Sequence, residues 1–172
     1  YGTLRIEKKS DTGMNLPGAV IKIEHIESGQ TWTATTTSAG VAIFDQIPLG
    51  AYRIQEITAP AGWKLDDTVY TATVVAGETT TIPIINEELP GLRIIKYDRK
   101  NMVAMPNVTF AVYRDGKFLG NFKTDQFGEI LLTNVEPGTY RAFEVDTGDE
   151  GHILDTTPQE VELHAGDGIK EL

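Results

Sequence analysis

The stretch GTLRIEKKSD, residues 2–11, alternates between apolar and polar side chains with the period of two that a β-strand imposes. Leu4 and Ile6 lie on one face of this predicted strand, and the next member of that face is Lys8. The opposite face carries Arg5, Glu7 and Lys9 and is expected to face solvent. The stretch therefore predicts a strand that points an amine in the same direction as two core side chains.

The pattern returns in LRIIKYDR, residues 92–99, which places Lys96 over Lys8. Other segments keep nearly the same offset, such as TTSAG (36–40) with TDQFG (124–128) and IPLGAYRIQE (47–56) with VEPGTYRAFE (135–144). An offset that holds along the whole chain indicates two copies of one module. We expect a first domain at residues 1–88 and a second at residues 89–172.

Short alternating runs within each module are separated by clusters of Gly, Pro, Asn and Asp, and no long stretch has helical period. The run YRDGKFL, residues 113–119, places Asp-Gly between two such runs and predicts a two-residue hairpin. Strands of this length and spacing are typical of a β-sandwich or a partly open barrel. Two such modules with a linker of a few residues predict an elongated rod.

Two other predicted strands of the first module show the same alternation of side chains. Glu56 shares a face with apolar residues in AYRIQEI, residues 51–57, and Asn86 does so in TIPIINEE, residues 81–88. Three strands therefore each place one polar side chain, Lys8, Glu56 or Asn86, in line with apolar neighbours.

A lone buried lysine or glutamate costs several kcal/mol unless it is paired or neutral. One interpretation is a plain buried Lys8–Glu56 ion pair, and a second is that Lys8 reaches solvent at the end of its strand. A third uses Asn86, because a neutral amine is a nucleophile and a carboxamide polarised by a protonated acid is an electrophile. Lys8 would then attack Asn86, with Glu56 donating a hydrogen bond to the amide oxygen and relaying the proton.

Three segments resemble the Cna B-type (SpaA-like, prealbumin-like) domains of Gram-positive surface adhesins and pilins. They are LRIEKKSDTGMNLPGAVIKI (4–23), TTTSAGVAIFDQIPLGAYRIQEITAPAGW (35–63) and TIPIIN (81–86). The most specific part is YRIQEITAPAGW, residues 52–63, which is similar to the E-box of pilins. The resemblance implies an immunoglobulin-like or prealbumin-like β-sandwich. It also implies an intramolecular isopeptide bond between Lys8 and Asn86 with Glu56 as the catalytic residue.

The second module departs from this pattern in YRAFEVDTGDEGH, residues 140–152. Glu144 remains in the position of Glu56, but the Ala-Pro pair is absent and His152 replaces the aromatic residue. Glu144 is therefore a weaker candidate for a catalytic role.

The counterpart of Asn86 in the second module would fall at position 174 or 175, beyond Leu172. We therefore expect a truncated last strand there, with Lys96 and Glu144 paired to each other and no amide to react with. The alternative is that another chain or peptide supplies the missing strand.

The net charge of −10 argues against a nucleic-acid partner, and no apolar run approaches the roughly 20 residues of a membrane span. The chain has no cysteine. The three histidines, His25, His152 and His164, lie beside no carboxylate at the spacing of metal ligands and are predicted to be ordinary surface residues. We expect neither a metal nor a cofactor.

The resemblance implies that the chain forms structural stalk or spacer modules of a bacterial surface adhesin or pilus-like protein, extracellular and attached to the cell wall. The chemistry is a single-turnover self-cross-link, so the chain is not expected to be an enzyme. Its expected partners are neighbouring modules of the same protein. The alternatives are a module that binds a host matrix protein or glycan, and an accessory β-domain of a secreted enzyme.

Overall fold

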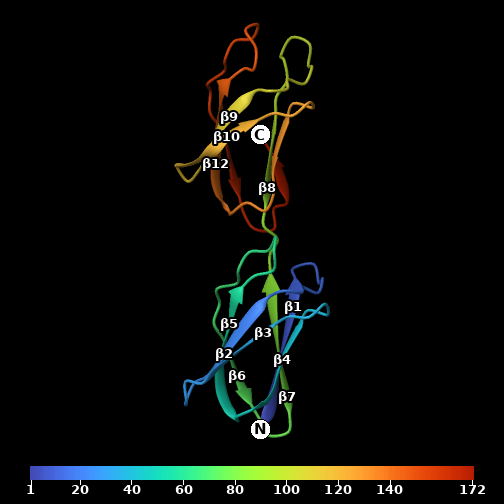
Figure 1. Cartoon of the computed structure of the whole chain (residues 1–172), viewed down its shortest axis with the longest axis vertical. Helices are drawn as coiled ribbons and strands as arrows, with labels where there is room; N and C mark the ends of the chain where they lie inside the picture. Colours follow the sequence, from blue (N-terminus) through green and yellow to red (C-terminus); the bar gives the residue numbers. More distant parts are fainter. The chain divides into compact units, whose positions relative to one another are not determined.

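The computed structural model describes all 172 residues and divides them into two compact units, unit 1 at Tyr1–Glu87 and unit 2 at Glu88–Leu172. The chain forms fourteen β-strands and no helix, which confirms the all-β prediction (Figure 1). No helix able to cross a membrane is present. The elongated rod expected from the sequence depends on how the two units are arranged relative to each other, so it stays a prediction.

Unit 1 packs a three-stranded sheet, in the order β4-β1-β7, against a four-stranded sheet, in the order β3-β2-β5-β6. Its strands are β1 (Gly2–Ser10), β2 (Val20–His25), β3 (Thr31–Thr35), β4 (Val41–Ile47), β5 (Gly50–Thr58), β6 (Tyr70–Val74) and β7 (Thr79–Asn86). The central strand β1 pairs antiparallel with β4 and parallel with β7. The first and last strands of the unit are therefore direct neighbours.

Unit 2 repeats this arrangement, with sheets in the orders β11-β8-β14 and β10-β9-β12-β13. Its strands are β8 (Gly91–Ile95), β9 (Thr109–Arg114), β10 (Lys117–Lys123), β11 (Glu129–Leu132), β12 (Gly138–Asp146), β13 (Gln159–Leu163) and β14 (Ile169–Glu171). Asp115 and Gly116 form the predicted two-residue turn between β9 and β10, both with positive φ. The last strand has three residues, against eight in β7.

The alternation of β1 follows the sandwich interior. Leu4, Ile6 and Lys8 are all 0% exposed, whereas Lys9 on the other face is exposed. Each of the three lies between the two sheets because side chains of one parity share a face of the strand. The interpretation in which Lys8 reaches solvent at the strand end is therefore wrong.

A hydrogen bond from a buried tyrosine hydroxyl to a loop carbonyl recurs in both units. It lies within the repeated segments 47–56 and 135–144. The hydroxyl of Tyr52 donates to the carbonyl of Pro48 at 2.7 Å, and that of Tyr140 donates to the carbonyl of Glu136 at 2.6 Å. Both rings are buried. Each hydroxyl therefore satisfies its hydrogen bond on the loop that precedes its own strand, β5 or β12.

A glycine in each unit packs against the backbone of the predicted site lysine. Gly40 has a φ of +73°, and a Cβ placed on it would lie 2.6 Å from the carbonyl oxygen of Lys8. Gly128 has a φ of +71°, and its Cβ would lie 2.6 Å from the carbonyl oxygen of Lys96. Both the backbone conformation and the close approach require glycine there.

We predict that Gly40→Ala destabilises unit 1 more than Gly77→Ala. Gly77 has a φ of +70° but open space around its Cβ position, so alanine there carries only the left-handed strain of about 1–2 kcal/mol. Gly40→Ala adds a clash with the backbone of Lys8 that costs about 1–3 kcal/mol more. Denaturant unfolding of the two variants measures the difference. Equal losses of stability would show that the close approach is unimportant.

Candidate functional site

Lys8, Glu56 and Asn86 meet in the interior of unit 1. Lys8 and Asn86 come from the neighbouring parallel strands β1 and β7, and Glu56 comes from β5 in the facing sheet. The ammonium nitrogen Nζ of Lys8 lies 3.4 Å from Oε1 of Glu56. Nδ2 of Asn86 donates to Oε2 of Glu56 at 2.8 Å. The three residues are 0%, 5% and 1% exposed in that order, so the site is closed to water.

Unmade hydrogen bonds are concentrated at this site. Four buried side-chain polar atoms of the chain lack a hydrogen-bond partner, and three of them are Nζ of Lys8, Oε1 of Glu56 and Oδ1 of Asn86. The 3.4 Å contact of Lys8 with Glu56 is an ion-pair distance without hydrogen-bond geometry. Leaving a buried polar group unsatisfied costs about 1–3 kcal/mol. Without a covalent bond, the three side chains therefore lower the stability of unit 1 by the cost of these unmade hydrogen bonds.

Burial shifts Lys8 toward its neutral form. Desolvation lowers the pKa of Lys8 below its usual value of 10.5, although the negative charge of Glu56 and, more weakly, that of Asp66 oppose the shift. A lysine with a lowered pKa gives up its proton more readily and becomes a nucleophilic amine. The electrostatics of the site thus favour amine chemistry at Nζ.

Two backbone groups of the loop after β5 complete the site, and sequence reasoning missed both. The carbonyl of Lys64 accepts a hydrogen bond from Nδ2 of Asn86 at 2.8 Å, and the N–H of Asp66 donates to Oε2 of Glu56 at 2.9 Å. A signal was available, because KLDDT at 64–68 and ILDTT at 153–157 correspond at an offset of 89.

The amide of Asn86 faces Glu56 through its nitrogen. Sequence reasoning expected its oxygen there, polarised by a protonated Glu56. The Lys64 carbonyl is an acceptor and therefore favours the nitrogen on that side. Glu56 thus contacts both Nζ of Lys8 and Nδ2 of Asn86.

Unit 2 holds a partial copy of this site. Nζ of Lys96 contacts Oε1 of Glu144, and the N–H of Asp155 donates to Oε2 of Glu144 at 3.1 Å. The Lys96 side chain is 23% exposed. Cavities of about 640 Å³ and 240 Å³ both border the Lys96–Glu144 pair. Lys96 therefore reaches solvent, unlike Lys8 in unit 1, whereas Glu144 is buried.

No residue of unit 2 occupies the place of Asn86. In unit 1 Asn86 lies opposite Ser10, and the counterpart of Ser10 at the offset of 88 is Asp98. Glu171 lies opposite Arg93, so the position opposite Asp98 is five residues farther on, at 176. The strand register thus places it one or two residues beyond the 174 or 175 expected from the sequence offset.

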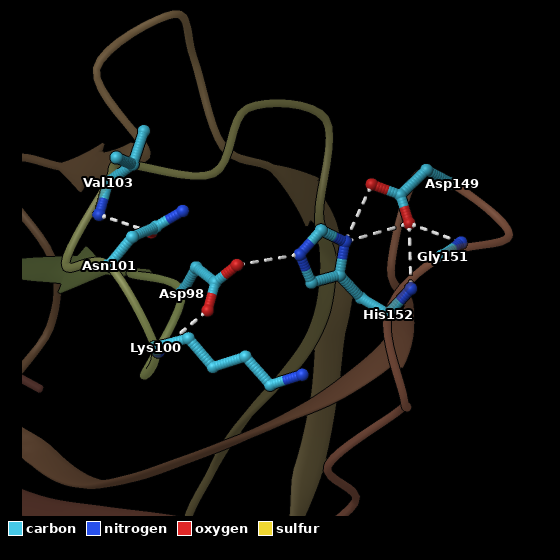
Figure 2. Close-up of polar contacts among 7 residues, drawn as sticks. All are labelled: Asp98, Lys100, Asn101, Val103, Asp149, Gly151 and His152. Carbon is cyan, nitrogen blue, oxygen red and sulfur yellow. Dashed lines mark hydrogen bonds and ion pairs between the residues drawn. The ribbon is translucent and has the colours of Figure 1, made fainter.

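His152 lies between two carboxylates (Figure 2), and it is one of the residues that line the cavity of about 640 Å³. Its Nε2 is 3.0 Å from Oδ2 of Asp98, and its Nδ1 is 2.8 Å from Oδ2 of Asp149. His152 is exposed, as expected, although it contacts two carboxylates; the expectation of a surface residue is wrong for His25, which is only 6% exposed. Sequence spacing concealed the contact because Asp98 and His152 are 54 positions apart.

We predict that the contribution of His152 to the stability of unit 2 falls as pH rises. Hydrogen bonds to Asp98 and then Asp149 raise the pKa of His152 above 6.5, and the same bonds lower the pKa of both carboxyls. The stabilisation is therefore complete between roughly pH 4 and 6.5, and it is lost as pH rises through the raised pKa. The difference in unfolding midpoint between wild type and His152→Gln, followed from pH 5.5 to 9 as a working range, measures it.

The control for this prediction is the double variant Asp98→Asn, Asp149→Asn. In that background the effect of His152→Gln is expected to be independent of pH, because no carboxylate remains to favour the protonated ring. A pH-independent effect in the otherwise wild-type chain would contradict the assignment.

The SpaA prealbumin-like fold domain matches the sequence twice, at residues 2–88 and 90–172. A comparison with curated proteins finds no match. Among solved structures, the TIE protein of Bacillus anthracis is 29% identical over 99% of this chain, with a TM-score of 0.54. The shaft pilin SpaA of Lactobacillus rhamnosus GG is 14% identical, with a TM-score of 0.59, and the match covers 99% of this chain and 96% of the pilin chain.

A streptococcal ancillary pilin is 17% identical over 99% of this chain, with a TM-score of 0.56. The present chain spans only 33% of the TIE protein and 61% of the ancillary pilin. The two pilin likenesses show the fold, and the two family matches cover almost every residue. The chain therefore belongs to the SpaA family of prealbumin-like fold domains, with one matched domain in each unit.

Proposed function

We propose that the chain is a structural stalk segment of a Gram-positive surface or pilus protein, exposed outside the cell. We further propose that an amide bond between Nζ of Lys8 and Cγ of Asn86 locks unit 1. The similar solved structures include a shaft pilin and an ancillary pilin, which supports the stalk role. The cross-link has its own support in the interior of unit 1.

The observation that carries the cross-link is the cluster of three unpartnered buried atoms on Lys8, Glu56 and Asn86. If Lys8 and Glu56 formed only an ion pair, Oδ1 of Asn86 would stay buried in the core without a hydrogen-bond partner. An amide bond removes the ammonium charge and turns two of the three residues into one neutral group. The cost of burying a charge is thereby relieved.

The reaction balances with the groups present. A proton passes from the Lys8 ammonium to Glu56, and the neutral amine attacks Cγ of Asn86 to form a new C–N bond. A second proton moves from Nζ through the Glu56 carboxyl group to Nδ2. The Cγ–Nδ2 bond then breaks and ammonia leaves. The products are a secondary amide, ammonia and a Glu56 that retains the first proton.

The position of the bond suits a chain that bears load. Tension on unit 1 enters through β1 and leaves after Asn86, at the end of β7. A bond between Lys8 and Asn86 joins these two strands directly, so residues 9–85 are bypassed by the force. Forced unfolding depends on the rate of opening, and a covalent tie blocks that opening.

We predict that the mature folded protein is lighter than its sequence by the mass of one ammonia. Lys8→Ala and Glu56→Ala are each expected to restore the full mass, since one removes the nucleophile and the other removes the proton carrier. Intact-mass spectrometry measures this directly.

The matched control is Lys96→Ala, which removes a lysine opposite a glutamate in unit 2 and is expected to keep the loss of one ammonia. Full mass in the wild-type chain would contradict the cross-link. Loss of ammonia that persists in Lys8→Ala would place the chemistry elsewhere.

We also predict that Lys8→Ala lowers the free energy of unfolding of unit 1 well beyond the effect of Lys96→Ala on unit 2. By the chain-entropy argument used for disulfides, a link that closes a loop of about 80 residues contributes about 4–5 kcal/mol. The paired comparison in denaturant separates this contribution from the deletion of a lysine side chain. Similar losses in the two units would mean that no covalent link stabilises unit 1.

A further inference from the structure

We infer that Asp66 is a positioning residue for the cross-linking reaction, an inference that rests on the cross-link proposed above. Its main-chain N–H holds one oxygen of Glu56, so that the carboxyl group bridges the attacking amine of Lys8 and the leaving nitrogen of Asn86. The contribution of Asp66 is made by its backbone N–H, and the sequence signals it only through the repeat of KLDDT (64–68) as ILDTT (153–157).

The two oxygens of Glu56 have different surroundings. Oε2 accepts two hydrogen bonds, from the N–H of Asp66 at 2.9 Å and from Nδ2 of Asn86 at 2.8 Å. Oε1 accepts none and faces Nζ of Lys8 at 3.4 Å. Without the Asp66 N–H, the carboxyl group would be freer to turn about its terminal bond, because only the Asn86 amide would hold Oε2. The backbone bond therefore sets which oxygen faces which reacting group.

The side chain of Asp66 fixes the direction of its own N–H. Oδ1 accepts a hydrogen bond from the N–H of Thr68 at 3.0 Å, which closes a tight turn. Oδ2 accepts from the hydroxyl of Tyr70 at 2.5 Å. Burial opposes ionisation of Asp66, but the bonds from Tyr70 and Thr68 outweigh it and lower its pKa. Burial and Asp66 together raise the pKa of Tyr70 to about 12, so Tyr70 remains a donor.

The same turn recurs in unit 2, beside the Lys96–Glu144 pair. The N–H of Asp155 donates to Oε2 of Glu144 at 3.1 Å, and Oδ1 of Asp155 accepts from the N–H of Thr157 at 2.9 Å. In both units the main-chain N–H of this turn donates to Oε2 of the glutamate, so orienting the glutamate is the function that we assign to the turn.

The test is the rate at which newly made protein loses ammonia, followed by intact mass. Asp66→Ala removes both side-chain bonds that fix the N–H and is expected to slow the reaction roughly tenfold, the effect of weakening one charge-assisted hydrogen bond. Asp66→Asn keeps an oxygen for the Thr68 N–H and is expected to restore most of the rate. Asp67→Ala is the matched control, because it removes the neighbouring exposed carboxylate and leaves the rate unchanged.

Tyr70→Phe provides a milder variant if Asp66→Ala folds poorly. It removes only the hydroxyl bond to Oδ2 and is expected to slow the reaction by a few-fold. Rates for Asp66→Ala and Tyr70→Phe equal to that of Asp67→Ala would overturn the role of Asp66 while leaving the cross-link intact. Full mass in the wild-type chain would overturn the cross-link itself, and the role of Asp66 with it.

Discussion

The buried amine of Lys8 is the constraint on which the rest of unit 1 depends. It lies in the same row as Leu4 and Ile6 on the central strand β1, fully enclosed between two sheets. A charge in that place is costly, and one carboxylate at 3.4 Å offsets only part of the cost. The surrounding structure keeps Lys8 close to Glu56 and Asn86 through the parallel pairing of β1 with β7 and the turn at Asp66. Burial, which ordinarily destabilises a lysine, here favours the neutral form that can react.

The loop that follows the glutamate-bearing strand makes different contacts in the two units. In unit 1 the loop after β5 is tied to the last strand, since Lys64 bonds Asn86 through its carbonyl and Glu87 through its N–H. In unit 2 the corresponding loop is tied instead to the segment after β8, through His152 and Asp98. The Lys96–Glu144 pair is partly exposed, so water shares the task of stabilising its charges.

Much of this was predictable because it depends on periodicity. The alternation of side chains in a strand predicted that Lys8, and not Lys9, faces the interior, and that Glu56 and Asn86 face it too. The internal repeat predicted two copies of one module. The remainder depends on features that side-chain patterns do not encode. The N–H of Asp66 and the carbonyl of Lys64 act through the backbone, and the contact of His152 with Asp98 joins distant loops. The orientation of the Asn86 amide follows from its acceptors, Glu56 and Lys64, and not from its place in the strand.

The central claim is that Lys8 is no longer a free amine in the mature chain. Tandem mass spectrometry of a protease digest of the folded wild-type protein tests it most directly. The account predicts one branched peptide in which the segment carrying Lys8 is joined by an amide to the segment carrying Asn86. Recovery of Lys8 in a linear peptide with an unmodified side chain, together with an intact carboxamide at Asn86, would contradict it.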